Sequence, residues 1–369
     1  MNNWYEIDRI QDIDSPSLVL YKNHFEHNLH KMLEMVNNQP EILMPHIKTN
    51  KMPKVLNHFI ALGILNFKAS TISEAEIAAK AGAVSVLLAH QLVGPKIDRF
   101  CNLINHFPET QFLTIVDNKL SVRLLNEAAQ KHHVEIGIFI DVNNGMNRSG
   151  IEPNNNVYEL VDNIKSHNNL YFKGLHVYDG HFRDPNFQER KNRIEDSFSE
   201  IITIQNSLKK SYPNIQLICG GTPSFTSHLL EPNRICSPGT CVFWDFGYNE
   251  KLAEQQFKFA VLVITRVVSM PKKGIVTIDL GHKAVASENP IDKRIRFLNL
   301  SKYTLLSQSE EHGVLSVEHD SKIEIGDVLY GVPYHICPTI NLYDDITVIS
   351  DSKNIDVWEI SARKRKLTI

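Results

Sequence analysis

The chain has 369 residues and a formal net charge of −3, with 42% hydrophobic and 22% charged residues. This composition is that of a globular protein with a sizeable core, and the charge gives no electrostatic reason to expect a nucleic acid or an acidic membrane surface as a partner. The length favours two domains, or one large α/β barrel with an appended domain.

The sequence is that expected of a cytoplasmic protein that does not enter a membrane. Residues 1–14 lack a basic region followed by an apolar one, so no signal peptide is expected. No apolar run approaches the roughly 20 residues that a membrane-spanning helix needs. The five cysteines are scattered and odd in number, which argues against a disulfide framework and for a reducing compartment.

From about residue 40, short apolar runs alternate with longer amphipathic stretches. The apolar runs read EILMPHIK, ILNFKAS, VSVLLAH, QFLTIVD, VEIGIFIDV, LYFKGLHVYD, IQLICGG and NRICSPG. Most are followed by a stretch of helical character, such as ISEAEIAAKAG. This alternation predicts an α/β fold with a parallel (β/α)8 TIM-type barrel, which we assign to residues 14–245; a doubly wound open sheet is the alternative.

The pattern changes after residue 245. Runs such as GIVTIDLG, HGVLSVEHD, DVLYGVP and DITVIS are short, β-rich and separated by Gly, Pro and Asp. They predict a C-terminal all-β domain over residues 246–369. We expect the N-terminal segment, residues 1–21, to join this domain, because it contains the strand candidate SPSLVLYK.

Two glycine-containing stretches follow the last two predicted barrel strands. GGTPS places Gly221 and Thr222 between a strand and a helix start, and SPGT places Gly239 and Thr240 in a similar position. Backbone N–H groups and hydroxyls at such positions form an anion site, most naturally for a phosphate. Plain turn chemistry accounts for the same residues as well.

Lys48 ends the first predicted barrel strand. A strand-end lysine at a barrel mouth is partly desolvated, which favours the neutral amine that attacks carbonyls. With a phosphate cradle in the same mouth, it predicts a phosphorylated aldehyde cofactor, pyridoxal phosphate. Lys51 and Lys54 are expected on the following helix. Arg148 either pairs with an oxyanion or lies on a surface loop.

His335 and Cys337, in YHICPTINLYD, are two residues apart. In a strand they would project from the same face, where an imidazole and a thiolate can share a zinc ion. The alternative is a packed histidine beside a buried thiol.

The stretch PHIKTNK resembles the Pro-His-x-Lys-Thr-His-Lys motif of the D-threonine aldolase and D-serine dehydratase family, which are pyridoxal phosphate enzymes with the alanine racemase fold. The resemblance continues through GMNRSG, GGTP, SPGT, SEEHG and HICPTINLYD, in the family's order, over essentially the whole chain. It implies a pyridoxal phosphate site in the barrel and a C-terminal β domain.

The resemblance also assigns roles to individual residues. It implies that Lys48 binds the cofactor aldehyde covalently, that Arg148 hydrogen-bonds the phenolic oxygen of the cofactor, and that Tyr178 lies near the cofactor. The residues that match the family's phosphate site are Gly221, Thr222, Gly239 and Thr240. Those that match its divalent-metal pair are His335 and Cys337.

The chain departs from the family pattern at several positions. Asn50 and Cys241 replace a histidine and a tyrosine that are common there. YDGHFRD lacks the histidine that aldolases carry a few residues after the glycine, so we expect His181, or alternatively Asp184, to act as the base. The cysteine of the metal pair resembles the dehydratase branch and suits zinc, with manganese as the other candidate.

The resemblance implies a lyase that acts on D-amino acids with a β-hydroxyl group. We favour a D-threonine aldolase, which gives glycine and an aldehyde; a D-serine dehydratase is the first alternative. An amino-acid racemase and a cofactor-carrying protein without turnover are the other two hypotheses. The expected partner is a small D-amino acid, without nucleic acid or membrane, and a homodimer is left open.

Overall fold

The computed structural model describes residues 3–369. It divides into two units. The unit that we call the barrel unit consists of Leu33–Gly239 and Ser361–Ile369, and the one that we call the β unit consists of the N-terminal part up to Met32 and Thr240–Ile360. No helix within residues 3–369 is long and apolar enough to cross a membrane.

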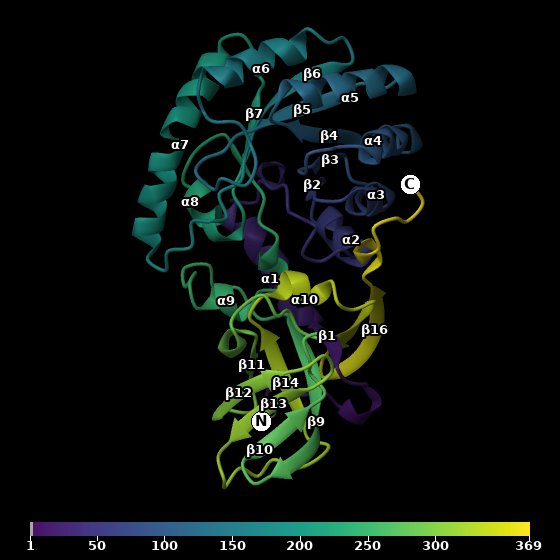
Figure 1. The fold of residues 1–369 in the computed structure, drawn as a ribbon, viewed down its shortest axis with the longest axis vertical. Coiled ribbons are helices and arrows are strands. Elements are labelled where there is room, and N and C mark those ends of the chain that lie inside the picture. The colour runs from purple at the N-terminus through teal and green to yellow at the C-terminus, as the bar shows by residue number, and fades with distance from the viewer. Residues whose placement is uncertain (1–2) are drawn as a thin grey trace. The chain divides into compact units, whose positions relative to one another are not determined.

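The barrel unit contains a sheet of seven parallel strands in chain order (Figure 1). The strands are β2 (Asn66–Ala69), β3 (Ser85–Leu88), β4 (Gln111–Val116), β5 (Ile136–Asp141), β6 (Leu170–Val177), β7 (Gln216–Cys219) and β8 (Arg234–Cys236). The segment 43–46 joins the two edges of the sheet: Met44 N donates to Cys236 O at 2.8 Å, and Lys68 N donates to Pro45 O at 3.0 Å. The sheet is therefore a closed barrel, as the sequence predicted, and the open-sheet alternative is wrong.

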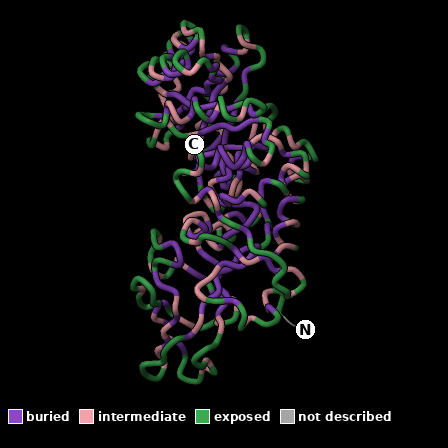
Figure 2. The backbone as a smooth tube through the Cα atoms, turned by 90° about the vertical axis from the view of Figure 1, so that its right-hand side faces the viewer, coloured by how far each residue is buried: buried purple, intermediate pink, exposed green. Residues whose placement is uncertain are grey.

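Helices follow the strands because the intervening stretches are amphipathic and carry capping residues. The helices of this unit are α2 (Pro53–Ala61), α3 (Ile72–Ala81), α4 (Pro95–His106), α5 (Lys119–His132), α6 (Asn155–Lys165), α7 (Phe187–Lys209) and α8 (Phe225–His228). The Thr71 side chain, for example, accepts from Glu74 N at the start of α3, and Gly82 ends this helix with φ +97°. Strands β3 and β5 are buried at every position. Figure 2 colours the backbone by burial, with buried residues in purple and exposed residues in green.

The C-terminal segment 361–369 belongs to the barrel unit. Ala362 N donates to Lys51 O at 3.1 Å, Thr368 N donates to a Glu76 carboxylate oxygen at 3.1 Å, and an Arg99 Nη donates to Ile369 O at 2.7 Å. In Figure 1 this segment is the yellow end of the chain beside α2 and α3. The segment therefore ties the turn after Lys48 to the outer helices.

The β unit contains a mixed sheet in the order β12-β13-β10-β9-β1-β15-β16, with β14 also paired to β9 and β11 paired to β14. Its strands are β1 (Ser17–Tyr21), β9 (Val261–Lys272), β10 (Ile275–Ile278), β11 (Ile295–Phe297), β12 (Tyr303–Gln308), β13 (Gly313–Val317), β14 (Val328–Pro333), β15 (Asp345–Ser350) and β16 (Lys353–Glu359). Strand β1 is antiparallel to β9 and parallel to β15, and α1 (Lys22–Met35) follows it. The β unit also contains two short helices, α9 (Phe246–Asn249) and α10 (Ile336–Ile340).

We predict that Gly174→Ala strongly destabilises the protein. Gly174 lies in β6 with φ +148°, and a Cβ there would come within 1.9 Å of Gln216 O on β7. Backbone strain and the clash together should lower the free energy of unfolding by about 3 kcal/mol or more in urea denaturation. Gly82→Ala is the matched control, because it also has a positive φ but no heavy atom within 4 Å, and strain alone costs about 1–2 kcal/mol. Equal losses for the two variants would show that the close approach of β7 contributes nothing.

Candidate active site

The Tyr178 ring lies directly after β6, at the carboxyl end of the barrel strands. Two glycines leave the space that the ring occupies. A Cβ on Gly180 would lie 2.1 Å from Tyr178 Oη, and one on Gly221 would lie 3.0 Å from Tyr178 Cε2. The ring therefore packs against bare backbone, including that of the predicted phosphate loop. Tyr178 and Gly221, both expected in the cofactor site, are thus neighbours.

Three cations surround the Tyr178 ring. Lys48 Nζ lies 5.5 Å, Lys68 Nζ 5.6 Å and the Arg148 guanidinium carbon 4.8 Å from the ring centroid. The sequence predicted Lys48 and Arg148, and the structure brings them together. Among the ion pairs of residues 3–369, none involves these three side chains. A cluster of cations without carboxylate partners favours an anionic ligand.

Lys68 was missed by the sequence analysis. It occupies an inward-facing position in β2 and is only 2% exposed, and its amine has no hydrogen-bond partner. Burial, and then the positive charge of Lys48, lower the pKa of Lys68 to about 7. The available signal was a lysine inside an otherwise apolar barrel strand, ILNFKAS, where a charge is expensive unless it has a function.

The two predicted phosphate loops are joined to each other. Gly239 N donates to Thr222 Oγ1 at 3.2 Å. A Cβ on Gly239 would lie 2.8 Å from His46 O and 2.9 Å from Thr49 Oγ1, so only glycine lets this loop approach the turn that carries Lys48. The structure thus places Gly221, Thr222 and Gly239 around the predicted lysine.

A buried polar network supports the loop that begins at Gly221. Ser224 Oγ accepts from Gly221 N at 3.2 Å and donates to Asp179 Oδ1 at 2.5 Å. Asp179 Oδ2 lies 2.7 Å from His228 Nε2, and Arg234 Nη1 lies 2.8 Å from His228 Nδ1. Because arginine can only donate, His228 accepts at Nδ1 and donates its Nε2 proton to Asp179. This network fixes the conformation of the loop, and it already engages the Gly221 N–H.

A second histidine–carboxylate pair lies beside the cation cluster. His176 Nδ1 is 2.7 Å from Asp141 Oδ1, and Gln91 Nε2 donates to Asp141 Oδ2 at 2.8 Å. Burial, and then the charge of Lys68, lower the pKa of His176, so the ring is neutral and donates its Nδ1 proton to Asp141. Its Nε2 is buried and has no hydrogen-bond partner. This nitrogen is therefore available to accept a proton or hydrogen bond from a ligand.

The two candidate bases, His181 and Asp184, differ in their interactions with neighbouring side chains. Asp184 forms an ion pair with Arg193, whose Nη1 lies 2.7 and 2.9 Å from the two carboxylate oxygens. His181 packs on Phe182 with ring centroids 4.0 Å apart, and its Nδ1 has no hydrogen-bond partner. Burial lowers the pKa of His181, although the Asp179 carboxylate opposes this effect. A neutral and unengaged imidazole favours His181 over Asp184 as the base.

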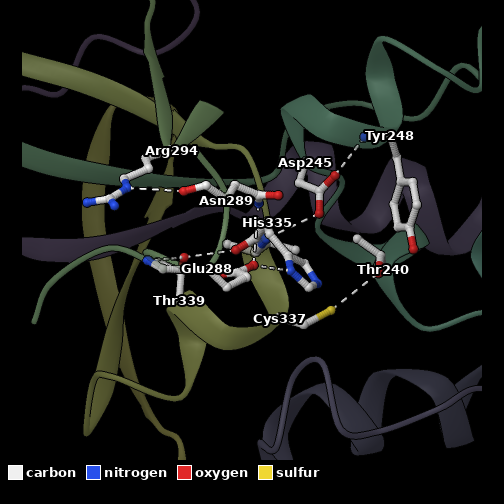
Figure 3. Close-up of polar contacts among 11 residues, drawn as sticks. Thr240, Asp245, Tyr248, Glu288, Asn289, Arg294, His335, Cys337 and Thr339 are labelled. Atoms are coloured by element: carbon white, nitrogen blue, oxygen red, sulfur yellow. Dashed lines mark hydrogen bonds and ion pairs between the residues drawn. The ribbon is translucent and has the colours of Figure 1, made fainter. Parts of the chain in front are cut away.

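The predicted metal pair lies in the β unit (Figure 3). The expected strand at this position is wrong: His335 is the N-cap of α10, and Cys337 lies in the first turn of this five-residue helix. The side chains still meet, because the Cys337 sulfur hydrogen-bonds the His335 ring. Thr240 Oγ1 lies 3.4 Å from Cys337 Sγ, which places this predicted phosphate ligand beside the pair.

Two carboxylates that the sequence analysis missed fix the position of His335 and its helix. Glu288 Oε1 lies 2.5 Å from His335 Nδ1, which leaves Nε2 as the ring nitrogen for another partner. Asp245 is 1% exposed and accepts from Ile336 N at 3.2 Å, at the start of α10. Within residues 3–369, no group of three or more His, Cys, Asp or Glu side chains is arranged to hold a metal ion.

The residues of the barrel mouth fit pyridoxal phosphate. Several polar atoms at the carboxyl ends of β2, β5, β6 and β8 are buried without a partner, as expected where a ligand completes the hydrogen bonds. They are Lys68 Nζ, both amide atoms of Asn144, His176 Nε2, His181 Nδ1 and Ser237 Oγ. An amine, an aromatic face and two glycine loops in the same mouth match an aldehyde, a conjugated ring and a phosphate.

The chain is similar in sequence to proteins of known activity. The sequence model of the alanine racemase N-terminal domain matches residues 21–245, and a serine dehydratase domain model matches residues 260–349. The D-threonine aldolase of an Arthrobacter species is 27% identical over 96% of this chain and 94% of its own. The 3-hydroxy-D-aspartate aldolase of Paracoccus denitrificans strain Pd 1222 is 27% identical over 95% of this chain and 92% of its own.

A solved structure extends the similarity to three dimensions. The crystal structure of D-threonine aldolase from Filomicrobium marinum has a TM-score of 0.88 and 27% identity, and the match covers 97% of this chain and 98% of that one. The chain therefore belongs to the alanine racemase N-terminal domain family, and its expected place in the aldolase and dehydratase group of these enzymes is confirmed.

Proposed function

We propose that the protein is a pyridoxal phosphate-dependent lyase that acts on D-3-hydroxy amino acids, and specifically a D-threonine aldolase. The observation that carries the proposal is the cluster of Lys48, Lys68 and Arg148 around Tyr178, without carboxylate partners and next to two glycine loops. The similarity to two aldolases over nearly the whole chain supports it. A racemase or a carrier protein has no comparable support from these relatives.

The site residues named above have proposed roles in holding the cofactor. Lys48 would bind the aldehyde, Arg148 the phenolic oxygen, and Tyr178 would pack against the ring. The residues that would hold the phosphate are Gly221, Thr222, Gly239 and Thr240. When bound, pyridoxal phosphate supplies an electron-withdrawing ring that weakens a bond at the substrate Cα. The protein decides which bond breaks by the direction in which it holds the substituents of that carbon.

We assign the removal of the β-hydroxyl proton to His181. Cleavage between Cα and Cβ requires a base near that hydroxyl, at a distance of hydrogen-bond length. His181 is neutral and its Nδ1 has no partner, whereas the Asp184 carboxylate is held by Arg193. A neutral imidazole can take the proton and later return it to the product.

We propose that His335 and Cys337 bind a divalent metal ion, zinc or manganese. Such an ion would supply a Lewis acid for the substrate hydroxyl. Glu288 holds Nδ1 of His335 at 2.5 Å, the arrangement in which a carboxylate orients a metal-binding imidazole. With two protein ligands, the remaining positions stay open for substrate and water.

A D-serine dehydratase, or a dehydratase of another D-3-hydroxy amino acid, is the second candidate. It is favoured by the thiolate ligand Cys337, which resembles the dehydratase branch. The D-threo-3-hydroxyaspartate dehydratase of Delftia sp. strain HT23 is 19% identical over 95% of this chain. Loss of the Cα proton, followed by hydroxide, would then replace cleavage of the carbon–carbon bond.

We predict that the purified protein converts D-threonine to glycine and acetaldehyde and leaves L-threonine unchanged. The two Cα substituents would exchange places in L-threonine, so the bond to be broken would no longer face the correct direction. Lys48→Ala should abolish both the visible absorbance of the covalently bound cofactor and the formation of glycine. The surface variant Lys54→Ala should retain both. Formation of 2-oxobutanoate and ammonia would instead identify a dehydratase.

We predict that His335→Ala and Cys337→Ala each lose a stoichiometric metal ion but retain the bound cofactor. Turnover of D-threonine should fall by about 100-fold, measured together with metal content by atomic emission spectroscopy. A chelator should reproduce the loss in the wild-type protein, and added zinc or manganese should reverse it. Cys101→Ala, which removes a buried thiol of the barrel unit, is the matched control and should keep the metal. Full activity of metal-free protein would contradict the role of the metal and favour a racemase.

We predict that His181→Ala slows aldehyde release from D-threonine by about 100-fold or more, which is the scale of losing a general base. Cofactor absorbance and its change on adding D-threonine should persist, because substrate binding does not require this base. Asp184→Asn should reduce the rate much less. The reverse order of the two variants would move the role of base to Asp184.

A further inference from the structure

Lys68 carries a buried amine that no residue within 3–369 hydrogen-bonds. It is 2% exposed, and its Nζ has neither a hydrogen-bond partner nor an ion pair within the described residues 3–369. An ammonium without a partner in a protein interior costs several kcal/mol, and an uncharged amine without a hydrogen bond still loses its hydration. The buried Lys68 amine therefore lowers the stability of the folded protein.

The carboxylates nearest to Lys68 are already engaged elsewhere. Asp141 is hydrogen-bonded by His176 and Gln91, and Asp179 is hydrogen-bonded by Ser224 and His228. The nearby amine of Lys48 repels Lys68. None of residues 3–369 is therefore left to pair with Lys68, which makes a bound ligand its expected partner.

The position of Lys68 shows where such a partner would lie. Lys68 Nζ and Lys48 Nζ are 5.6 and 5.5 Å from the centroid of the same Tyr178 ring. A planar molecule that packs on this ring is therefore within reach of both amines. His176 Nε2, buried and also unpartnered, adds a second polar group on this side of the barrel.

Another buried lysine shows what a purely structural role looks like. Lys51 is 8% exposed, and its Nζ forms an ion pair with the buried Glu74 at 2.5 Å. The carboxylate that Lys51 requires is supplied by α3 of the same unit. Lys68 has no equivalent carboxylate, so the stability of the barrel does not explain it.

We propose that Lys68 is a ligand-binding residue whose amine binds an oxyanion of a molecule that packs against Tyr178. The oxyanion is a phenolate or a carboxylate oxygen attached to a conjugated system. The identity of that molecule rests on the proposed function: the phenolate would belong to pyridoxal phosphate, and the carboxylate to the D-amino acid bound to it. Lys68 thus adds a second polar contact to an oxyanion, beside that of Arg148.

The test compares Lys68→Met with Lys51→Met in the full chain. Lys68→Met removes an unpartnered amine and should raise the melting temperature of the cofactor-free protein by a few degrees. Lys51→Met leaves Glu74 buried without its cation and should lower the melting temperature. A purely structural role for Lys68 would predict a loss of stability for both variants.

Binding is measured with two probes. Pyridoxal phosphate is titrated into cofactor-free protein and followed by absorbance, and D-alanine, which has a carboxylate but no β-hydroxyl, is titrated into loaded protein. Lys68→Met should weaken one of these by about 10-fold or more, the scale of a lost charged hydrogen bond, whereas Lys51→Met should weaken neither. Weaker binding of the cofactor assigns the oxyanion to the phenolate, and weaker binding of D-alanine alone assigns it to the substrate carboxylate.

Unchanged affinity for both probes in Lys68→Met would overturn the role of Lys68 and leave the proposed function intact. A wild-type protein that takes up no pyridoxal phosphate would overturn both, and this result is visible before any variant is compared. Lys68→Gln is the second variant, because it keeps a donor without the charge. If Lys68→Met does not fold, a loss of affinity in Lys68→Gln supports the proposal and wild-type affinity overturns it.

Discussion

The closure of the barrel at the short segment 43–46 is the constraint on which the candidate site depends. Met44 and Pro45 hydrogen-bond the two edge strands β8 and β2, but Pro45 has no N–H to donate. The segment makes isolated bridges to both strands, and the chain turns away after Ile47, whose N–H still donates to Lys68 O at 2.9 Å. This early turn places Lys48 at the rim of the barrel. If the strand were longer and regular, Lys48 would lie within the sheet and not at its end.

Most of the barrel was predictable because strands buried on both faces are nearly continuous apolar runs, and the helices between them are amphipathic. The site was predictable only in part. Lys48 and Arg148 lie in recognisable motifs, whereas Lys68 lies in an apolar run where its inward direction depends on the register of β2 with its neighbours. Glu288 and His335 are 47 residues apart in the sequence, and no local sequence pattern predicts that they interact.

The conformation of the metal pair was missed for a different reason. Alternating spacing made His335 and Cys337 look like neighbours on one face of a strand. The structure instead turns the chain into a helix of five residues, which is too short to show a helical period in the sequence. The Asp245 carboxylate, distant in sequence, accepts from Ile336 N at the start of this helix. A tertiary contact thus contributes to the local conformation here.

The buried polar groups of the barrel fall into two sets: one set is fully hydrogen-bonded, and the other contains atoms without partners among the described residues. Behind the Gly221 loop, Ser224, Asp179, His228 and Arg234 satisfy one another, and such a complete network gives rigidity. Around Tyr178, by contrast, Lys68 Nζ and His176 Nε2 have no partners. Binding sites often retain such unfavourable groups at the expense of stability, because only a ligand can complete them.

The path of the chain has a consequence for any attempt to separate the two units. The chain enters the barrel unit after Met32, leaves it after Gly239 and re-enters it at Ser361. A single cut therefore cannot release either unit intact. A continuous piece from Leu33 to Gly239 would lack the segment whose Ala362 N binds Lys51 O, in the turn that follows Lys48. Residues 361–369 thus contact the turn that follows Lys48. Each unit is made of two separate segments of the chain and is not a continuous domain.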